Sequence, residues 1–234
     1  MPGVLSAARY EAIKGAPKYL ACYELESVAV MQTPAFTSRP RTPWGQKVSP
    51  SVIGKNLTRI VGEQIYPDGV EIPERGMAPV LQIGRMSVPA EVDAEWNAWY
   101  SGEYVPGYRK VPGVIYARRY RVLEGTSGYS TVYEFASTAV PESPEWKEQQ
   151  QHSSPNSPRM RQAMTHAPGS AGVYVRVNPY SPGCAQTLPL DGAAVRLGFA
   201  GTFRRSELSW DMADLTETRM PAADDPPHQE GRGK

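Results

Sequence analysis

Two tyrosines and one arginine are the residues whose types and positions could support chemistry. Tyr104 and Tyr108 follow a predicted helix, where a hydroxyl can donate a hydrogen bond to a ligand carbonyl or stabilise an enolate. Arg119 lies in a predicted strand that is buried on both faces, where a guanidinium needs a carboxylate or an anionic ligand. These three residues are the predicted catalytic set. The competing interpretations are aromatic packing for the tyrosines and a structural Arg–Glu pair.

Other polar and aromatic side chains are predicted to bind a ligand beside this set. They are Trp99, Tyr100, Tyr116, Tyr133, Glu134 and His166. Four of them also have a structural interpretation. Trp99 has the spacing of a helix core, Tyr133 alternates in a strand, and His166 near a helix end suits the C-terminal dipole. Glu134 is the expected partner of Arg119 on the neighbouring strand.

An internal repeat indicates which elements position these residues. Residues 2–36 align with residues 112–146 without a gap, and 14 of the 35 aligned positions are identical. The identical pairs include Arg9/Arg119, Tyr23/Tyr133 and Glu24/Glu134. Similarity at one fixed spacing indicates a repeated structural unit and outweighs local propensity.

The second copy predicts a complete βαββαβ unit over residues 78–177, which is the ferredoxin-like plan. The expected order is a strand at 78–86, a helix to about Tyr100, an irregular connection, a hairpin, further helices starting at Ser143-Pro144 and Ser157-Pro158, and a strand at 172–177. Helices cover only one face of such a sheet, so its other face must pack against a second sheet. The predicted fold class is therefore α+β, with two ferredoxin-like (βαββαβ) repeats forming a pseudo-dimeric α/β barrel.

The first copy lacks the strand and helix that begin the second copy. It predicts a hairpin over residues 2–25, a helix at Thr33-Pro34, a helical piece from Ser49 that includes Val61, and a short strand at 64–66. Three explanations are open: truncation of a chain that starts roughly 30 residues upstream, a strand from another chain, or a strand at 193–203 followed by a helix at 206–220. Truncation is favoured. The predicted organisation is a partial repeat at 1–66, a linker at 67–77, a complete repeat at 78–177 and a partly disordered tail at 178–234.

Composition excludes several classes of function. The net charge of +1, from 25 basic and 24 acidic residues, gives no electrostatic footprint for nucleic acid or anionic membranes. No apolar run approaches the ~18 residues of a membrane span, and the start lacks a signal-peptide pattern. Two isolated cysteines, Cys22 and Cys184, fit a reducing cytoplasm. Neither a phosphate-binding loop nor a metal-ligand spacing is present, so no cofactor or metal is expected.

Five short motifs together resemble EthD-like proteins of the dimeric α/β-barrel superfamily. They are Trp99-Tyr100-x-x-x-Tyr104-x-Pro106, Val111-Pro112-Gly113-Val114, Arg118-Arg119-Tyr120, Tyr129-x-x-x-Tyr133-Glu134 and His166-Ala167-Pro168-Gly169-Ser170. The resemblance covers residues 2–177. Many EthD-like sequences have a histidine where Tyr104 stands, so histidine acid–base chemistry does not carry over to this position.

The resemblance implies a barrel that binds a small hydrophobic or aromatic ligand. It also implies a cofactor-free enzyme that carries out proton transfer, dehydration or elimination, or oxygenation on such a metabolite. The alternatives are a non-catalytic binding or accessory protein and a truncated, inactive gene product. A homodimer is compatible with this plan, above all if the first repeat is incomplete.

Overall fold

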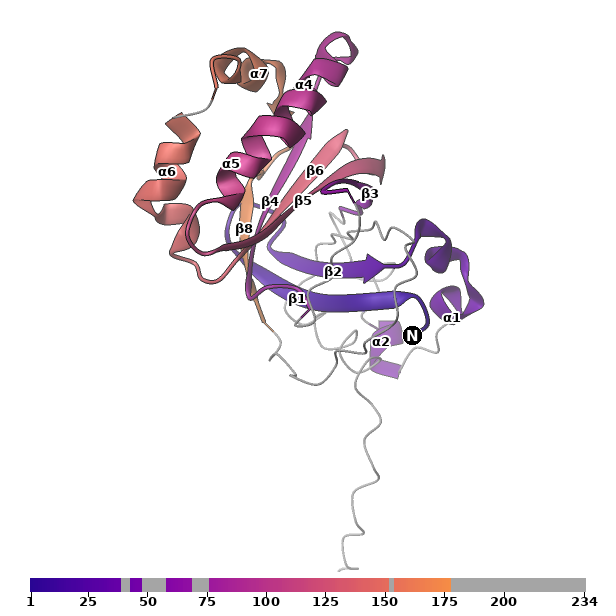
Figure 1. The fold of residues 1–234 in the computed structure, drawn as a ribbon. Helices are drawn as coiled ribbons and strands as arrows, with labels where there is room; N and C mark the ends of the chain where they lie inside the picture. Colours follow the sequence, from indigo (N-terminus) through magenta and orange to yellow (C-terminus); the bar gives the residue numbers. More distant parts are fainter. Residues whose placement is uncertain (39–42, 48–57, 69–75, 152–153, 178–234) are drawn as a thin grey trace, which may run out of the picture.

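The chain folds as an α+β protein built on one curled antiparallel sheet (Figure 1). The structure is a computed structural model that describes residues 1–38, 43–47, 58–68, 76–151 and 154–177. Within these residues the sheet order is β2-β1-β8-β4-β6-β5-β3, and the short strand β7 pairs with β4. The strands are β1 (Val4–Lys14), β2 (Tyr19–Leu25), β3 (Val61–Tyr66), β4 (Val80–Ser87), β5 (Val114–Glu124), β6 (Tyr129–Phe135), β7 (Thr165–His166) and β8 (Gly172–Arg176).

Helical segments lie mainly on one face of the part of the sheet formed by β8, β4, β6 and β5 (Figure 1). The α-helices are α1 (Pro34–Thr37), α2 (Pro43–Lys47), α4 (Asp93–Trp99), α5 (Val105–Arg109), α6 (Pro144–Gln151) and α7 (Ser157–Ala163). Short 3₁₀ segments precede α1, α4 and α6, at Val28–Gln32, Ala90–Val92 and Val140–Glu142. A π-helical segment, Tyr100–Tyr104, joins α4 to α5.

The two hairpins have the same bounds at a spacing of 110 residues, β1–β2 in the first copy and β5–β6 in the second. Gly3 and Gly113 precede them with positive φ angles of 78° and 86°. A Cβ at Gly3 would lie 2.5 Å from Val30, and one at Gly113 would lie 2.6 Å from Val140, so both positions require glycine. The repeated sequence therefore adopts the same local conformation twice.

Both copies belong to one continuous sheet. The hairpin of the first copy joins it through β1, which pairs with β8. Strand β3 joins the opposite end by pairing with β5. Within the described residues the predicted strand positions are confirmed, although Val61, expected on a helix, is the first residue of β3.

The helix that precedes the second hairpin is longer than predicted. It was expected to end near Tyr100, with an irregular connection to follow, but helical structure continues through the π-helical segment to Arg109. Pro106 falls in α5 directly after the π-helical segment, where the helix has already left the regular i→i−4 hydrogen-bond pattern. Tyr104 and Tyr108 consequently lie on a helical segment and not on a loop.

Two of the predicted helix starts are confirmed by their capping hydrogen bonds. Thr33 Oγ1 accepts from the amide of Phe36 at 3.3 Å, and Ser143 Oγ accepts from the amide of Trp146 at 3.1 Å. Ser157, predicted as a cap, is the first residue of α7. The expected helix start at Ser49 and the expected elements at 193–220 lie outside the described residues.

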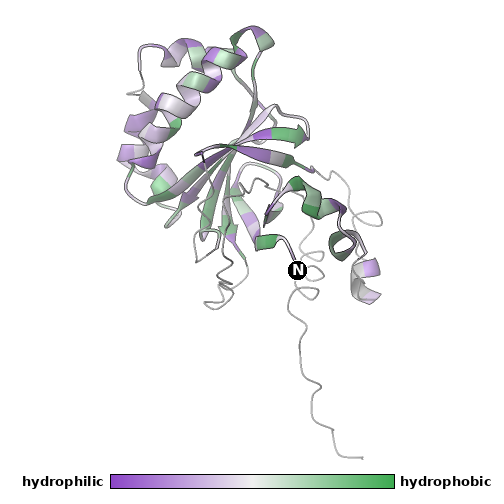
Figure 2. Ribbon diagram, turned by 45° about the vertical axis from the view of Figure 1, so that its right-hand side comes forward, coloured by the Kyte–Doolittle hydropathy of each residue, from purple (hydrophilic) through white to green (hydrophobic). Residues whose placement is uncertain are grey.

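Both faces of the sheet are buried. The core on the helix side includes Trp96, Tyr108, Phe135, Trp146 and Met160. The core on the opposite side includes Ala8, Tyr10, Leu20, Leu81 and Tyr174. Hydrophilic residues also lie along the central strands (Figure 2), which indicates polar groups inside the sheet.

Cys22 of β2 provides a test of burial on the opposite side. Burial, with a smaller contribution from Glu134, raises the pKa of the Cys22 thiol to about 12. Because the thiolate is the nucleophile, Cys22 should resist thiol reagents at pH 8 in the folded protein and react quickly in denaturant. The measurement is the labelling rate in a Cys184→Ser background, which leaves Cys22 as the sole thiol. Equal rates in native buffer and in denaturant would contradict this burial.

Candidate functional site

Aromatic side chains fill the space between the helical segment 93–109 and the sheet. Neighbouring ring centroids lie between 4.4 and 6.3 Å apart, in tilted, edge-on or stacked arrangements. We call this group the aromatic cluster; it consists of Trp96, Trp99, Tyr100, Tyr104, Tyr108, Tyr129, Tyr133, Phe135 and Trp146. The π-helical segment lies in its middle, and such segments often occur at functional sites.

Tyr104 and Tyr108 form the polar pair of the aromatic cluster. They stand four residues apart on the helical segment, and the Tyr104 hydroxyl donates to the Tyr108 hydroxyl at 3.4 Å. Tyr108 is buried, whereas Tyr104 is half-buried. Burial raises the pKa of Tyr108 well above its usual range, and the neighbouring Tyr104 adds to the rise. Tyr108 is therefore a neutral hydrogen-bond donor at physiological pH and not a base.

Two further tyrosines of the cluster share this character. Burial is the largest cause that raises the pKa of Tyr100 and of Tyr133. Tyr104 and Tyr108 raise the pKa of Tyr133 further, while the cation of Arg119 opposes the rise at Tyr100. The cluster thus presents several neutral hydroxyls next to one buried positive charge.

Arg119 lies beneath the aromatic cluster and is fully buried. Its Nη2 donates to Asn97 Oδ1 at 2.7 Å, and its Nη1 donates to Ser101 Oγ and to the carbonyl of Asn97. The guanidinium carbon is 4.5 Å from the Tyr100 ring centroid and 5.0 Å from that of Trp96. Burial lowers the pKa of Arg119. Amide, hydroxyl and aromatic groups thus hold this cation.

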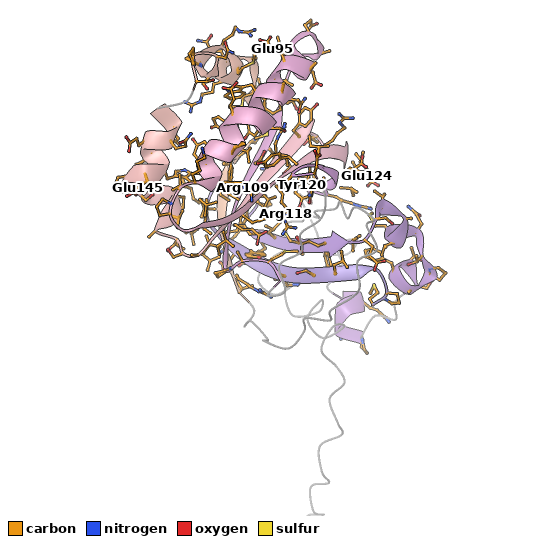
Figure 3. All side chains as sticks on the ribbon, viewed as in Figure 1. Glu95, Arg109, Arg118, Tyr120, Glu124 and Glu145 are labelled. Atoms are coloured by element: carbon orange, nitrogen blue, oxygen red, sulfur yellow. The ribbon has the colours of Figure 1, made fainter. Side chains whose placement is uncertain are left out.

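The predicted pairing of Arg119 with Glu134 is wrong. Glu134 Oε1 accepts from Arg118 Nη2 at 2.7 Å, and Glu24 Oε1 accepts from Arg118 Nη1. The reason is strand register: Glu134 lies opposite Tyr116, which shares a sheet face with Arg118, while Arg119 points to the helix side. Arg118 and the two glutamates form a buried ionic triad on the face opposite the aromatic cluster. Arg118 lies on the side of β5 towards the hairpin β1–β2 (Figure 3).

The structure divides the predicted site residues into three groups. On the helix side it brings together the predicted catalytic set and three of the predicted ligand-binding residues, Trp99, Tyr100 and Tyr133. Tyr116 and Glu134 lie on the opposite face, where the Tyr116 ring centroid is 5.0 Å from the Arg118 guanidinium carbon.

His166 belongs to neither face. It lies in β7, is exposed, and pairs with Met86 of β4, so it is not a helix residue as predicted. The atoms packed beside its ring still remove part of its water, and this desolvation lowers the pKa of His166.

The polar residues that position Arg119 were not predicted from the sequence. Besides its bond to Arg119, Asn97 donates from Nδ2 to the Tyr129 hydroxyl at 2.8 Å. Tyr129 in turn donates to Asp93 Oδ1 at 2.7 Å. Asp93, Asn97 and Ser101 follow one another at intervals of four residues, which places them on one face of a helix. This spacing is the signal in the sequence that could identify the three residues as one polar group.

Neither metal ligands nor membrane spans are found in the described part of the chain. Across the described ranges, no three His, Cys, Asp or Glu side chains are placed to hold a metal ion. None of the helices in the same ranges is long and apolar enough to cross a membrane.

The class of protein that the fold defines is an α+β protein with a curled antiparallel sheet. No family model and no curated protein matches the chain. Among solved structures, it is similar to one described as "Crystal structure study of anthrone oxidase-like protein", with 15% identity and a TM-score of 0.48, covering 80% of this chain and 83% of the other. A likeness of this degree does not assign an activity.

Proposed function

We propose that the chain is a small-molecule-binding barrel of the EthD-like kind, in which a partial ferredoxin-like repeat at 1–66 and a complete one at 78–177 form one sheet. Residues 67–77 serve as the linker and residues 178–234 as the tail. The strand order β8-β4-β6-β5 and the helices between these strands support a ferredoxin-like unit. The pairings of β1 with β8 and of β3 with β5 support a pseudo-dimeric arrangement.

The ligand contacts the aromatic cluster beside Tyr104. The observation that carries this proposal is the half-buried Tyr104, whose hydroxyl is bonded to that of the buried, neutral Tyr108 within the aromatic cluster. Such a surface suits a flat hydrophobic or aromatic molecule that carries a carbonyl or phenolic oxygen. On binding, the Tyr104 hydroxyl turns to donate to that oxygen and accepts a hydrogen bond from Tyr108 in its place. The fixed charge of Arg119 behind Tyr100 favours negative charge on the ligand oxygen.

The reaction that fits these groups is proton transfer next to a carbonyl, without a cofactor. Neutral tyrosines stabilise the enolate that forms when a proton leaves the carbon beside the carbonyl group, and the proton goes to water. Binding without turnover is the second candidate. It is favoured by the hydrogen bonds of Arg119 to Asn97 and Ser101, which hold this cation within the chain.

Replacing Tyr104 with phenylalanine tests the proposal directly. With 2-tetralone as the probe in deuterated buffer, the rate of exchange of the hydrogens beside the carbonyl should fall about 100-fold, because a positioned donor is lost. The melting temperature should stay unchanged, since the ring is retained. Exchange is followed by NMR, and binding is followed by tryptophan fluorescence.

Tyr174→Phe is the matched control, because Tyr174 is a buried tyrosine on the opposite face. It should exchange the probe at the wild-type rate. Wild-type exchange in Tyr104→Phe would remove Tyr104 from the mechanism. Binding of 2-tetralone without exchange above the buffer rate would establish the non-catalytic candidate, and the absence of binding by a panel of aromatic ketones and phenols would overturn the proposed function.

A further inference from the structure

The two ends of the curled sheet, β2 and β3, have a common feature. Within the described ranges, β2 pairs only with β1 and β3 pairs only with β5. Leu25 of β2 and Val61 of β3 nevertheless belong to one small buried cluster, so the curl brings the two ends close together. An edge without a partner presents a row of backbone donors and acceptors to another strand.

The register shows which strand position lies between these ends. The pairing of β1 with β8 recurs in the pairing of β5 with β3, and both have a register shift at the equivalent place, beside Lys14 and beside Glu124. Strand β3 has a second shift between Gln64 and Tyr66. The equivalent pairs are Tyr10–Arg176 and Tyr120–Gln64, Glu11–Val175 and Arg121–Glu63, Ala12–Tyr174 and Val122–Gly62, and Lys14–Val173 and Glu124–Val61. Strand β3 is therefore the counterpart of β8, and β2 is the counterpart of β6. In the second copy, β4 lies between β6 and β8 and pairs with both. The equivalent position in the first copy, between β2 and β3, therefore has room for one strand.

A buried carboxylate marks the start of that position. Glu134 Oε2 accepts from the amide of Ala78, just before β4, at 2.9 Å. Its counterpart Glu24 is 5% exposed, and its Oε2 has no hydrogen-bond partner among the described residues. A buried carboxylate oxygen without a donor is costly. An amide that precedes a strand between β2 and β3 would satisfy Glu24 as Ala78 satisfies Glu134.

We propose that the space between β2 and β3 binds one extended strand supplied by a second polypeptide, antiparallel to β2. The strand resembles β4 in chemistry, with apolar residues that alternate as Leu81 and Ile83 do, and the amide before it donates to Glu24. A second copy of this chain cannot supply its own β4, because β4 is paired on both edges. The mode of binding is strand addition to an open sheet edge.

The full-length chain tests this with a synthetic peptide of the sequence of residues 77–87. The amide of Ala21 is the reporter. The backbone bonds from Ala12 N to Lys18 O and from Glu26 N to Gly3 O show that the even-numbered residues of β2 direct their N–H and C=O groups towards β1. The amide of Ala21 therefore faces the open edge of the sheet. Hydrogen exchange at Ala21 should slow at least tenfold when the peptide saturates the protein. A scrambled peptide should leave the exchange rate unchanged.

A second peptide, methylated on the amide that corresponds to Ala78, removes the donor to Glu24. It should bind about tenfold more weakly, since a hydrogen bond to a charged group is lost. Equal binding of the two peptides would overturn the placement against Glu24. Slow exchange at Ala21 before any peptide is added would show that the chain itself fills the space, and unchanged exchange at saturating peptide would show that nothing binds there; either result overturns the proposal.

Discussion

Replacing Arg118 with methionine is expected to lower the free energy of unfolding by about 3–5 kcal/mol. Arg118 is the cation between Glu24 and Glu134, and all three side chains are buried. Methionine fills a similar volume but leaves two carboxylates without a counter-charge inside the sheet. The loss is measured from urea unfolding of the wild type and the variant at pH 7.

The matched control replaces the whole triad with neutral residues of similar size, Glu24→Gln, Arg118→Met and Glu134→Gln together. It should lose less stability than Arg118→Met alone, because no charge then remains buried. A single Arg118→Met variant that stays within about 0.5 kcal/mol of the wild type would show that water reaches the two carboxylates.

Replacing Trp96 with alanine is expected to cost about 3–5 kcal/mol of unfolding free energy, the range for deletion of a large aromatic core side chain. Trp96 has no exposed surface, and its ring centroid lies 4.6 Å from that of Tyr100 and 5.2 Å from that of Tyr129. The substitution leaves a cavity and also removes one aromatic face from Arg119. The loss is measured from the urea unfolding midpoint and slope.

Ile13→Ala provides the comparison for this deletion, because Ile13 lies in a strand but is 59% exposed. It should change stability by no more than about 0.5 kcal/mol. If Trp96→Ala lowered the free energy of unfolding as little as Ile13→Ala, the space around Trp96 would have to collapse almost completely. The aromatic cluster could then not be a rigid site.

The strands and hairpins could be predicted from the sequence because their signals are local. Alternating apolar residues and turn glycines define each strand, and the repeat carries one hairpin assignment over to the other copy. Capping residues such as Thr33 and Ser143 likewise act within one turn. The prediction placed an irregular connection at residues 102–111, a stretch with glycine and proline, which are poor helix formers. In the structure the π-helical segment carries the helix through Gly102 and on to Arg109.

The candidate site was only partly predictable. The sequence singled out Tyr104, Tyr108 and Arg119, and the structure does place them on the same side of the sheet. The sequence alone could not show that Asn97 and Ser101 would hold Arg119, because these contacts join a helical segment to a strand about 20 residues away.

By itself the sequence determined the residue types, the repeat and the alternation of each strand. Only the tertiary structure decided that Arg118, and not Arg119, meets Glu24 and Glu134, because that contact depends on the pairing of distant strands. A shift of one residue in the pairing register moves a side chain to the other face of a sheet. Local pattern therefore fixes which side chains share a face, and packing between the two copies decides what each face contacts.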